Sequence, residues 1–126
     1  DDTPRILVGD LNVAPHENDV WSHKQLLKIV SHTPIETETL EKSRKAGGFT
    51  DLARHVHDDD QKLYSWWSYR AKDWAASNKG RRLDHIWADE LAMPRVDLES
   101  YKVHLAWRGG WKPSDHAPLS IQLKPN

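Results

Sequence analysis

Short blocks of apolar residues alternate with polar stretches along this chain and predict several short strands and few helices. Arg5 to Asp10 contains consecutive apolar residues and predicts a short buried strand. A helix is predicted from Pro34 to about Ala46. Thr33 can cap this helix, and Glu36 can reach back to close a capping box. Gly47-Gly48 ends it, because glycine accepts the left-handed conformation found at helix ends.

The other expected elements are shorter. Strands are expected at residues 64–69, 82–88, 101–105 and 119–123, a new element begins at 49–55, and a short helix is allowed within 21–30. Loops are expected at 71–80, where one helical turn can form around Trp74, and at 107–118, which is rich in glycine and proline. Short strands, few helices and acidic residues at strand ends favour an α/β or α+β sandwich.

Composition narrows this interpretation. With 126 residues the chain is one domain at most. Its hydrophobic content of 37% is low for an α/β domain that folds alone, so we expect the chain to be part of a larger protein.

Membrane and targeting signals are not found in the sequence. No apolar run approaches the ~20 residues that span a bilayer, and the N-terminus lacks the regions of a signal peptide, which predicts a soluble, intracellular protein without a membrane partner. The absence of cysteine excludes disulfides, thiolate zinc sites and cysteine nucleophiles.

Charge is unevenly distributed, although the net charge is only -1. The window from Lys62 to Arg82 contains six basic residues and one acid, Asp73, together with five of the eleven aromatic residues. Basic groups neutralise phosphates and flat rings stack on bases, so this window is a plausible nucleic-acid surface. A half-buried strand whose cations extend to solvent is an equally good interpretation of the composition.

Three acids and one amide fall at predicted strand ends or in loops: Asp10, Asn12, Asp84 and Asp115. Mg2+ prefers hard oxygen ligands and keeps several of its waters, so a few carboxylates with a substrate phosphate make a natural site for it. Taken singly, each of these residues is more often a cap or turn residue at the surface. Together they suggest a metal-dependent phosphoryl site.

His116 adds a group that can donate a proton to a phosphoryl oxygen or form a hydrogen bond with it. A carboxylate on the far side of its imidazole would set the tautomer, and Asp84 is the candidate for that role. The seven remaining histidines of the eight show no ligand spacing such as His-Glu-x-x-His, which disfavours a zinc hydrolase.

Four motifs occur in the order and rough spacing of the exonuclease III type of abasic-site endonuclease. They are Gly9-Asp10-Leu11-Asn12, Ser65-Trp66-Trp67-Ser68-Tyr69-Arg70, Arg82-Leu83-Asp84-His85-Ile86 and Pro113-Ser114-Asp115-His116-Ala117-Pro118. The segments Asp19-Val20-Trp21 and Ser31-His32-Thr33-Pro34-Ile35-Glu36 resemble the bacterial branch. The likeness covers essentially the whole chain.

The resemblance implies an endonuclease/exonuclease/phosphatase fold, a four-layer α/β sandwich of the DNase I-like type, which uses Mg2+ or Mn2+ to hydrolyse DNA phosphodiesters. Asp10 matches an acid that orients or deprotonates the attacking water, and Asn12 matches an amide that contacts the metal–phosphate centre. Asp84 matches the carboxylate that pairs with the catalytic histidine, here His116, and Asp115 matches a metal-proximal acid. The implied metal ligands are thus Asp10, Asn12 and Asp115.

The same resemblance assigns five residues to DNA binding around an abasic sugar: Trp67, Arg70, Trp74, Arg81 and Arg82. The implied partner is DNA, especially at abasic sites and 3' ends. The implied location is the cytoplasm of a bacterial-type cell, in association with the nucleoid.

The likeness is to the C-terminal half of the family domain. The family's N-terminal half supplies a metal-binding glutamate, an early asparagine and an active-site tyrosine, and no segment here matches them. We therefore expect residues 1–126 alone to be inactive, to become active when the N-terminal half is supplied, and to self-associate through an open sheet edge. The alternatives are a phosphatase or phospholipid phosphodiesterase of the same superfamily, or a non-catalytic binding fragment.

Overall fold

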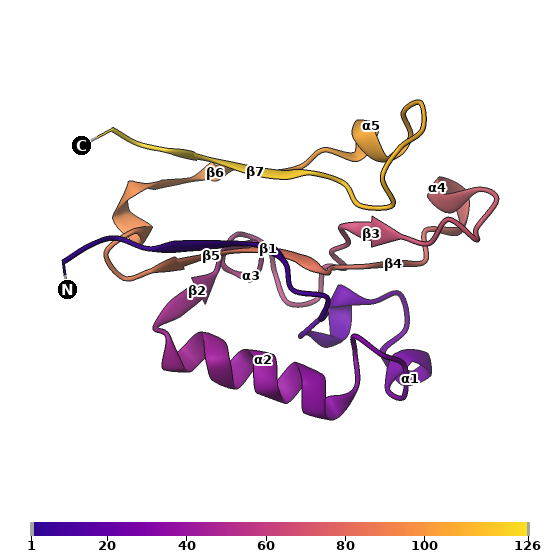
Figure 1. Ribbon diagram of the computed structural model, residues 1–126, viewed down its shortest axis with the longest axis horizontal. Helices are drawn as coiled ribbons and strands as arrows, with labels where there is room; N and C mark the ends of the chain where they lie inside the picture. The colour runs from indigo at the N-terminus through magenta and orange to yellow at the C-terminus, as the bar shows by residue number, and fades with distance from the viewer. Residues whose placement is uncertain (1, 126) are drawn as a thin grey trace.

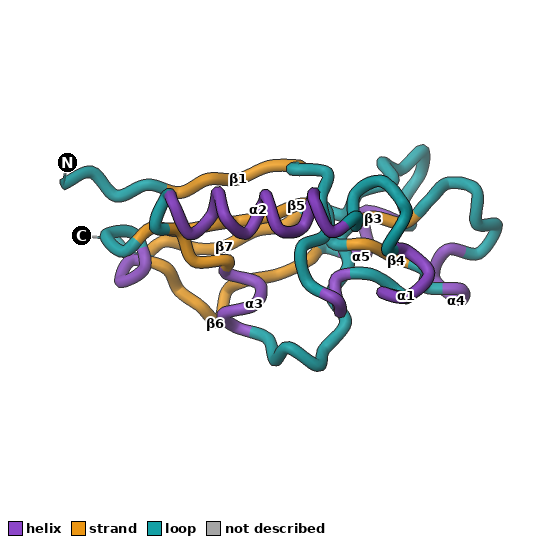
Figure 2. Tube along the Cα trace, turned by 90° about the horizontal axis from the view of Figure 1, so that it is seen from below, coloured by secondary structure: helices purple, strands orange, loops and turns teal. Residues whose placement is uncertain are grey.

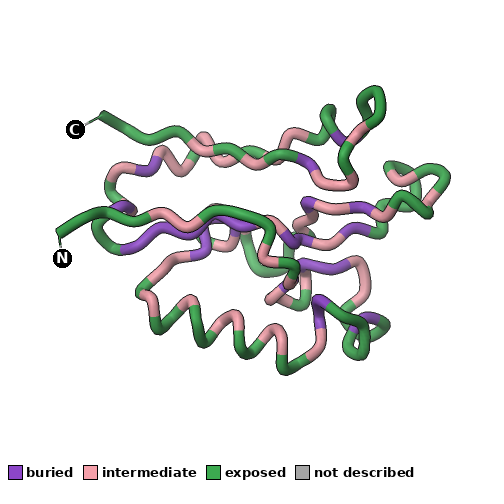
Figure 3. Tube along the Cα trace, in the orientation of Figure 1, coloured by how far each residue is buried: buried purple, intermediate pink, exposed green. Residues whose placement is uncertain are grey.

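The computed structural model describes residues 2–125, and strand β5 (Asp84–Asp89) lies at the centre of its main sheet. The strand order is β1-β5-β2, and β1 (Ile6–Asp10) and β2 (Phe49–Asp51) both run antiparallel to β5 (Figure 1). Every residue of β5 after Asp84 is buried, whereas β1 is partly exposed (Figure 3). The most exposed large apolar residue of β1 is Val8, at 64%. Because β1 pairs only with β5 among the described residues, its other edge is open.

A second pair of strands forms a layer above this sheet. β6 (Val96–Val103) and β7 (Leu119–Leu123) pair antiparallel, with a register shift between Asp97 and Lys102 (Figure 1). The apolar core between the layers consists of Leu52, Ile86, Ala88, Ala92 and Val96, with Ile6, Met93, Leu98, Tyr101, Leu119 and Ile121 packed against it. β6 begins five residues before the strand expected at 101–105 and ends at Val103, because helix α5 (Leu105–Arg108) starts there.

Helix α2 (Pro34–Ala46) lies on the face of the main sheet opposite β6 and β7 (Figures 1 and 2). Its bounds confirm the sequence prediction, because the local signals operate as expected. The Glu36 carboxylate accepts a 2.6 Å hydrogen bond from the Thr33 hydroxyl and a further bond from the Thr33 amide. The shorter helical segments are α1 (His23–Leu26), α3 (Leu52–Val56), α4 (Trp74–Ser77) and two 3-10 turns, Glu17–Asp19 and Met93–Arg95.

A small ribbon of β3 (Trp66–Trp67) and β4 (Gly80–Arg81) extends from the main sheet (Figure 1). The strand expected at 64–69 is shortened to two residues, because the Arg70 amide donates to the Ser68 hydroxyl and turns the chain. A side chain at Gly80 would lie 2.5 Å from Cγ of Tyr64, so the ribbon requires glycine there.

A buried ion-pair network joins the ribbon to the rest of the fold. Arg82 is 2% exposed and donates to both carboxylate oxygens of Asp19 and both of Asp51, at 2.7–2.9 Å. Arg54 also donates to Asp19, at 2.6 Å. Burial alone would raise the pKa of Asp19, but the charges and hydrogen bonds of Arg82 and Arg54 outweigh it and hold that pKa below its usual value.

This network corrects the prediction that Arg82 contacts DNA. Its guanidinium is fully engaged by two carboxylates inside the protein, so it is not free to bind a phosphate. In the part of the chain that the structure describes, no helix combines the length and the apolar character that crossing a membrane requires.

Candidate active site

The antiparallel register of β1 and β5 brings two of the predicted acids together. Asp10, the last residue of β1, is paired directly with Asp84, the first residue of β5. The Asp10 side chain is 47% exposed, and its Oδ1 accepts a 2.9 Å bond from the amide of Asn12. Asn12 has φ 56°, in the left-handed region that asparagine tolerates better than most residues. The turn after β1 therefore holds Asp10 at the open end of the sheet.

His116 lies between the predicted acids. Its Nδ1 is 2.7 Å from Oδ2 of Asp84, which is the hydrogen-bonded pair that the sequence predicts. An ionised carboxylate can only accept, so Nδ1 carries the proton and donates it. Nε2 then faces the other two acids, at 3.6 Å from Oδ2 of Asp10 and 3.8 Å from Oδ1 of Asp115.

These neighbours change the proton affinity of His116. Burial by itself lowers the pKa of the imidazole, but the hydrogen bond and charge of Asp84, with the charges of Asp10 and Asp115, act in the opposite direction. The net result is a pKa above the usual histidine value. The site therefore favours a protonated imidazole surrounded by three carboxylates.

Asp115 is positioned by β3. The indole nitrogen of Trp66 donates to its Oδ2 at 2.9 Å, and the amide of Trp67 donates to its backbone oxygen at 3.0 Å. A bridge between Trp66 and His116 extends the ribbon to the site. Sequence reasoning placed Trp66 in the aromatic window but missed this role, and no local pattern distinguishes it from the neighbouring tryptophan.

The donor set fits a hard divalent cation. Carboxylate oxygens of Asp10 and Asp84 lie within 4.8 Å of each other and of the His116 ring, and Asp115 turns Oδ1 toward the same place while Trp66 holds its Oδ2. Carboxylate oxygens on a partly exposed rim suit an ion that retains several waters. Asn12 is exposed, and its backbone amide is bonded to the Asp10 carboxylate.

Next to Trp66 lies a basic and aromatic pocket of about 480 Å³. We call it the basic pocket; it is lined by Trp21, Trp66, Trp67, Ser68, Arg70, Ala71, Trp74, Ser77, Lys79 and Arg81. The Arg81 guanidinium lies 5.1 Å from the Trp66 ring centre, and the Lys79 ammonium lies 4.7 Å from that of Trp21. The lining includes no acid, so the pocket attracts anions.

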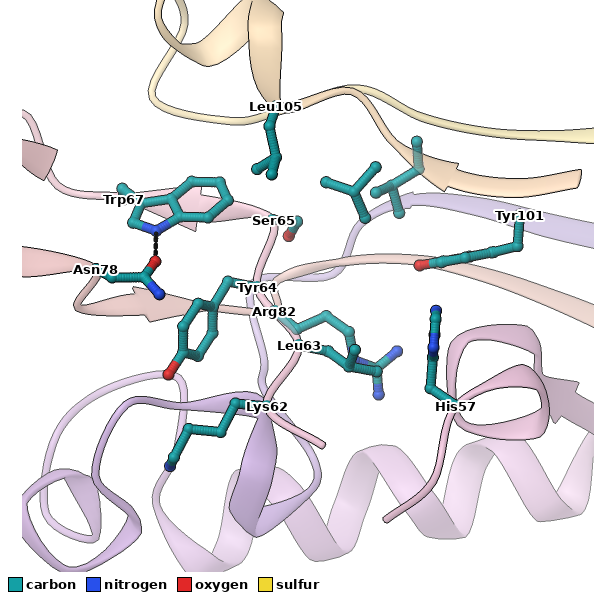
Figure 4. Close-up of a pocket in the computed structure, with 12 residues that line it drawn as sticks. His57, Lys62, Leu63, Tyr64, Ser65, Trp67, Asn78, Arg82, Tyr101 and Leu105 are labelled. Atoms are coloured by element: carbon teal, nitrogen blue, oxygen red, sulfur yellow. Dashed lines mark hydrogen bonds between the residues drawn. The ribbon is translucent and has the colours of Figure 1, made fainter. Parts of the chain in front are cut away.

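Four of the five predicted DNA-binding residues line this pocket: Trp67, Arg70, Trp74 and Arg81. Trp67 is 3% exposed, and its indole nitrogen donates to the Asn78 side chain at 3.0 Å (Figure 4). The structure therefore makes Trp67 a packing residue with little surface for a ligand. Sequence composition could not separate it from Trp66 or Trp74, because burial depends on the arrangement of the ribbon.

The fold and the site define a layered α/β protein with a cluster of carboxylates around one imidazole at an open end of its main sheet. The sequence profile of the Endonuclease/Exonuclease/phosphatase family matches residues 1–116, and the chain belongs to this family.

Similar proteins include an exodeoxyribonuclease of Bacillus subtilis, 34% identical over 120 residues, which cover 94% of this chain and 44% of that protein. The DNA repair nuclease APEX1 of Danio rerio is 33% identical over 95% of this chain and 36% of that protein. An AP endonuclease structure from Archaeoglobus fulgidus has a TM-score of 0.88 with 29% identity, over 98% of this chain and 47% of that one. The chain thus spans less than half the length of these relatives and matches their C-terminal part.

A further similar structure is a 3' phosphatase from Neisseria bound to a product DNA hairpin. It has a TM-score of 0.84 and 26% identity, over 94% of this chain and 44% of that one. These matches support the predicted fold, a DNase I-like α/β sandwich.

Proposed function

We propose that this chain supplies the C-terminal portion of a single nuclease domain that hydrolyses phosphodiesters in DNA during repair, at abasic sites or 3' ends. The observation that supports this most strongly is the position of His116, with Nδ1 bonded to Asp84 and Nε2 facing Asp10 and Asp115. An imidazole that is held on one side and free on the other suits contact with a phosphoryl group. Burial lowers the pKa of His116, but Asp84, Asp10 and Asp115 raise it above the usual histidine value, which favours the protonated imidazole that attracts an anionic phosphate.

Each residue receives a role from its place. Asp10 is the most exposed of the three acids around His116, so it orients the attacking water and accepts its proton. The water oxygen forms a bond to phosphorus as the ester P–O bond breaks, and the leaving oxygen keeps the electron pair of that bond and takes a proton from solvent water. The Nε2 proton of His116 forms a hydrogen bond with a phosphoryl oxygen as negative charge accumulates there.

The proposed cofactor is Mg2+, with Mn2+ as the alternative. Asp10, Asn12 and Asp115 would hold it, because Asp10 and Asp115 both face Nε2 of His116 and Asn12 is exposed in the turn directly after Asp10. When bound, such an ion polarises the phosphate and lowers the pKa of a water.

The basic pocket favours DNA over the other substrates of the family. Arg70, Lys79 and Arg81 supply positive charge, while Trp66 and Trp74 supply flat rings beside the proposed cleavage site. A nucleic acid strand carries regularly spaced phosphates and stacking bases, which this combination suits. A lipid or inositol headgroup has no need of so extended a surface. Removal of a 3' phosphate from DNA is a second candidate, supported by the similarity to the Neisseria 3' phosphatase.

The test uses the protein as its gene encodes it, with a DNA duplex containing one abasic-site analogue and a second duplex ending in a 3' phosphate. We expect Mg2+-dependent strand cleavage or phosphate release that EDTA abolishes. Asp10→Asn should lower turnover by at least ~100-fold, because it removes the proton acceptor and one charge beside the phosphate.

The matched control is Asp60→Asn, which neutralises an exposed acid in the turn at 57–60 and should leave turnover unchanged. Near-normal turnover of Asp10→Asn would refute the assigned role. Hydrolysis of phospholipid headgroups in place of DNA would show that the protein is a phospholipid phosphodiesterase of the same superfamily.

A further inference from the structure

Ser65 is the first residue of the motif segment at 65–70, and its side chain and backbone contact the motif segments at 82–86 and 113–118. The residue is 0% exposed. Its amide donates to the Arg81 carbonyl at 2.9 Å, and its carbonyl accepts from the Ala117 amide at 2.8 Å. Ser65 thus joins β3 to β4 on one side and to the segment that carries His116 on the other.

The Ser65 hydroxyl uses its full bonding capacity. It accepts from the amides of Leu83 and Asp84, both at 3.0 Å, and donates to Oδ2 of Asp84 at 2.7 Å. A hydroxyl has two acceptor lone pairs and one proton. Both lone pairs of the Ser65 hydroxyl accept hydrogen bonds from backbone amides. Its proton therefore points toward the Asp84 carboxylate.

We propose that Ser65 is a positioning residue that sets the orientation of the Asp84 carboxylate and, through it, the imidazole of His116. This inference rests on the proposed nuclease function. Oδ2 of Asp84 receives one bond from Ser65 and one from Nδ1 of His116, so both donors converge on a single oxygen. Rotation of the carboxylate would break both bonds at once. The position of Nε2 between Asp10 and Asp115 therefore depends on a hydroxyl that does not touch the substrate.

The surroundings of Ser65 provide a conservative variant. A cavity of about 320 Å³ lies behind it, between the ribbon and the segment of β6 and α5, and Ser65 is part of its lining (Figure 4). Tyr101 and Leu105 border the same space. Threonine keeps the hydroxyl and adds a single methyl group on the side of this cavity. Ser65→Thr should therefore preserve positioning, whereas Ser65→Ala removes it.

The first experiment needs no turnover. The Nδ1 proton of His116 should give a low-field proton resonance in the NMR spectrum of the chain, assigned by its loss in His116→Asn. We expect the resonance to persist in Ser65→Thr and to disappear or broaden in Ser65→Ala while the remaining amide spectrum stays dispersed. An unchanged resonance in Ser65→Ala would overturn the proposal.

The second experiment is a double-mutant cycle on DNA cleavage by the protein as its gene encodes it. Ser65→Ala should lower kcat by roughly 10-fold, the lower end of what loss of such an outer partner costs, with little change in KM. In an Asp84→Asn background the same substitution should cost nothing further, because Ser65 acts through that carboxylate. Ser65→Thr should restore kcat, and the control Ser43→Ala, on the exposed face of α2, should leave it unchanged.

Equal losses in both backgrounds would show that Ser65 only supports the fold, and would overturn the proposal. If the wild-type protein cleaves no DNA, the proposed function fails separately, and the proton resonance alone decides whether Ser65 positions the pair.

Discussion

Arg82 provides a sharp test of the buried network, because sequence and structure give it different roles. We predict that Arg82→Met destabilises the fold strongly. Methionine replaces the aliphatic part of the side chain but leaves Asp19 and Asp51 buried without their shared partner. Asp19 is 0% exposed and retains only Arg54 among its cationic partners.

The size of the effect follows from the contacts. Four charge-assisted hydrogen bonds disappear, and breaking a buried ion pair by removing one partner costs about 3–5 kcal/mol. Because whole domains are stable by only about 5–15 kcal/mol, this loss is a large part of the total. Arg82→Lys keeps the charge but cannot bond two carboxylates bidentately, so we expect a smaller loss.

The assay is urea unfolding at pH 7 and pH 5, followed by circular dichroism. The control is Arg70→Met, which removes an exposed cation from the same basic window and should change the free energy of unfolding by less than about 0.5 kcal/mol. A change of less than 1 kcal/mol for Arg82→Met would refute the reasoning, because the network would then contribute no more than a surface pair.

The pH dependence has a definite sign. Arg82 and Arg54 depress the pKa of Asp19 in the folded wild-type protein, so the stability that this group contributes is present above the unfolded pKa and is lost as pH falls through the folded pKa. In Arg82→Met burial should raise the pKa of Asp19 above its unfolded value, and protonation then relieves the buried charge. The difference between variant and wild type should therefore be smaller at pH 5 than at pH 7.

Two further predictions concern the proposed nuclease function. His116→Asn should lower turnover by at least ~100-fold, because asparagine cannot donate a proton to the phosphate while bonded to Asp84; single-turnover cleavage measures this, and near-normal rates would refute the role. Arg70→Ala should reduce the slope of log affinity for DNA against log salt by about 0.9, the value for one phosphate, whereas the control Lys42→Ala on α2 should leave it unchanged. An unaltered slope for Arg70→Ala would assign that arginine to packing.

Much of the local structure could be predicted from the sequence. The capping signals of Thr33 and Glu36 act within one turn, so they defined the start of α2 without help from the rest of the chain. The strand ending at Asp10 was recognisable for a similar reason, since its apolar run is continuous. The order of the motifs also identified the acids and the histidine that the structure brings together.

Strand limits that depend on a distant partner were beyond the sequence. β6 begins at Val96 because that residue pairs with Leu123, and this pairing leaves no mark near residue 96. The antiparallel pairing of β1 with β5, which sets Asp10 opposite Asp84, was likewise not visible in the two segments themselves.

The sequence by itself determined which chemical groups this protein carries and where its strongest local elements begin; tertiary structure decided what each group can do. Arg70, Arg81 and Arg82 belong to one basic window, yet Arg82 is enclosed by Asp19 and Asp51 while Arg70 is exposed. The role of Ser65 is equally hidden from the chain around it. The physical reason is the distance along the chain over which each interaction acts. Helix caps and turns involve residues a few positions apart, whereas burial, charge pairing and hydrogen-bond direction depend on partners that only folding brings together.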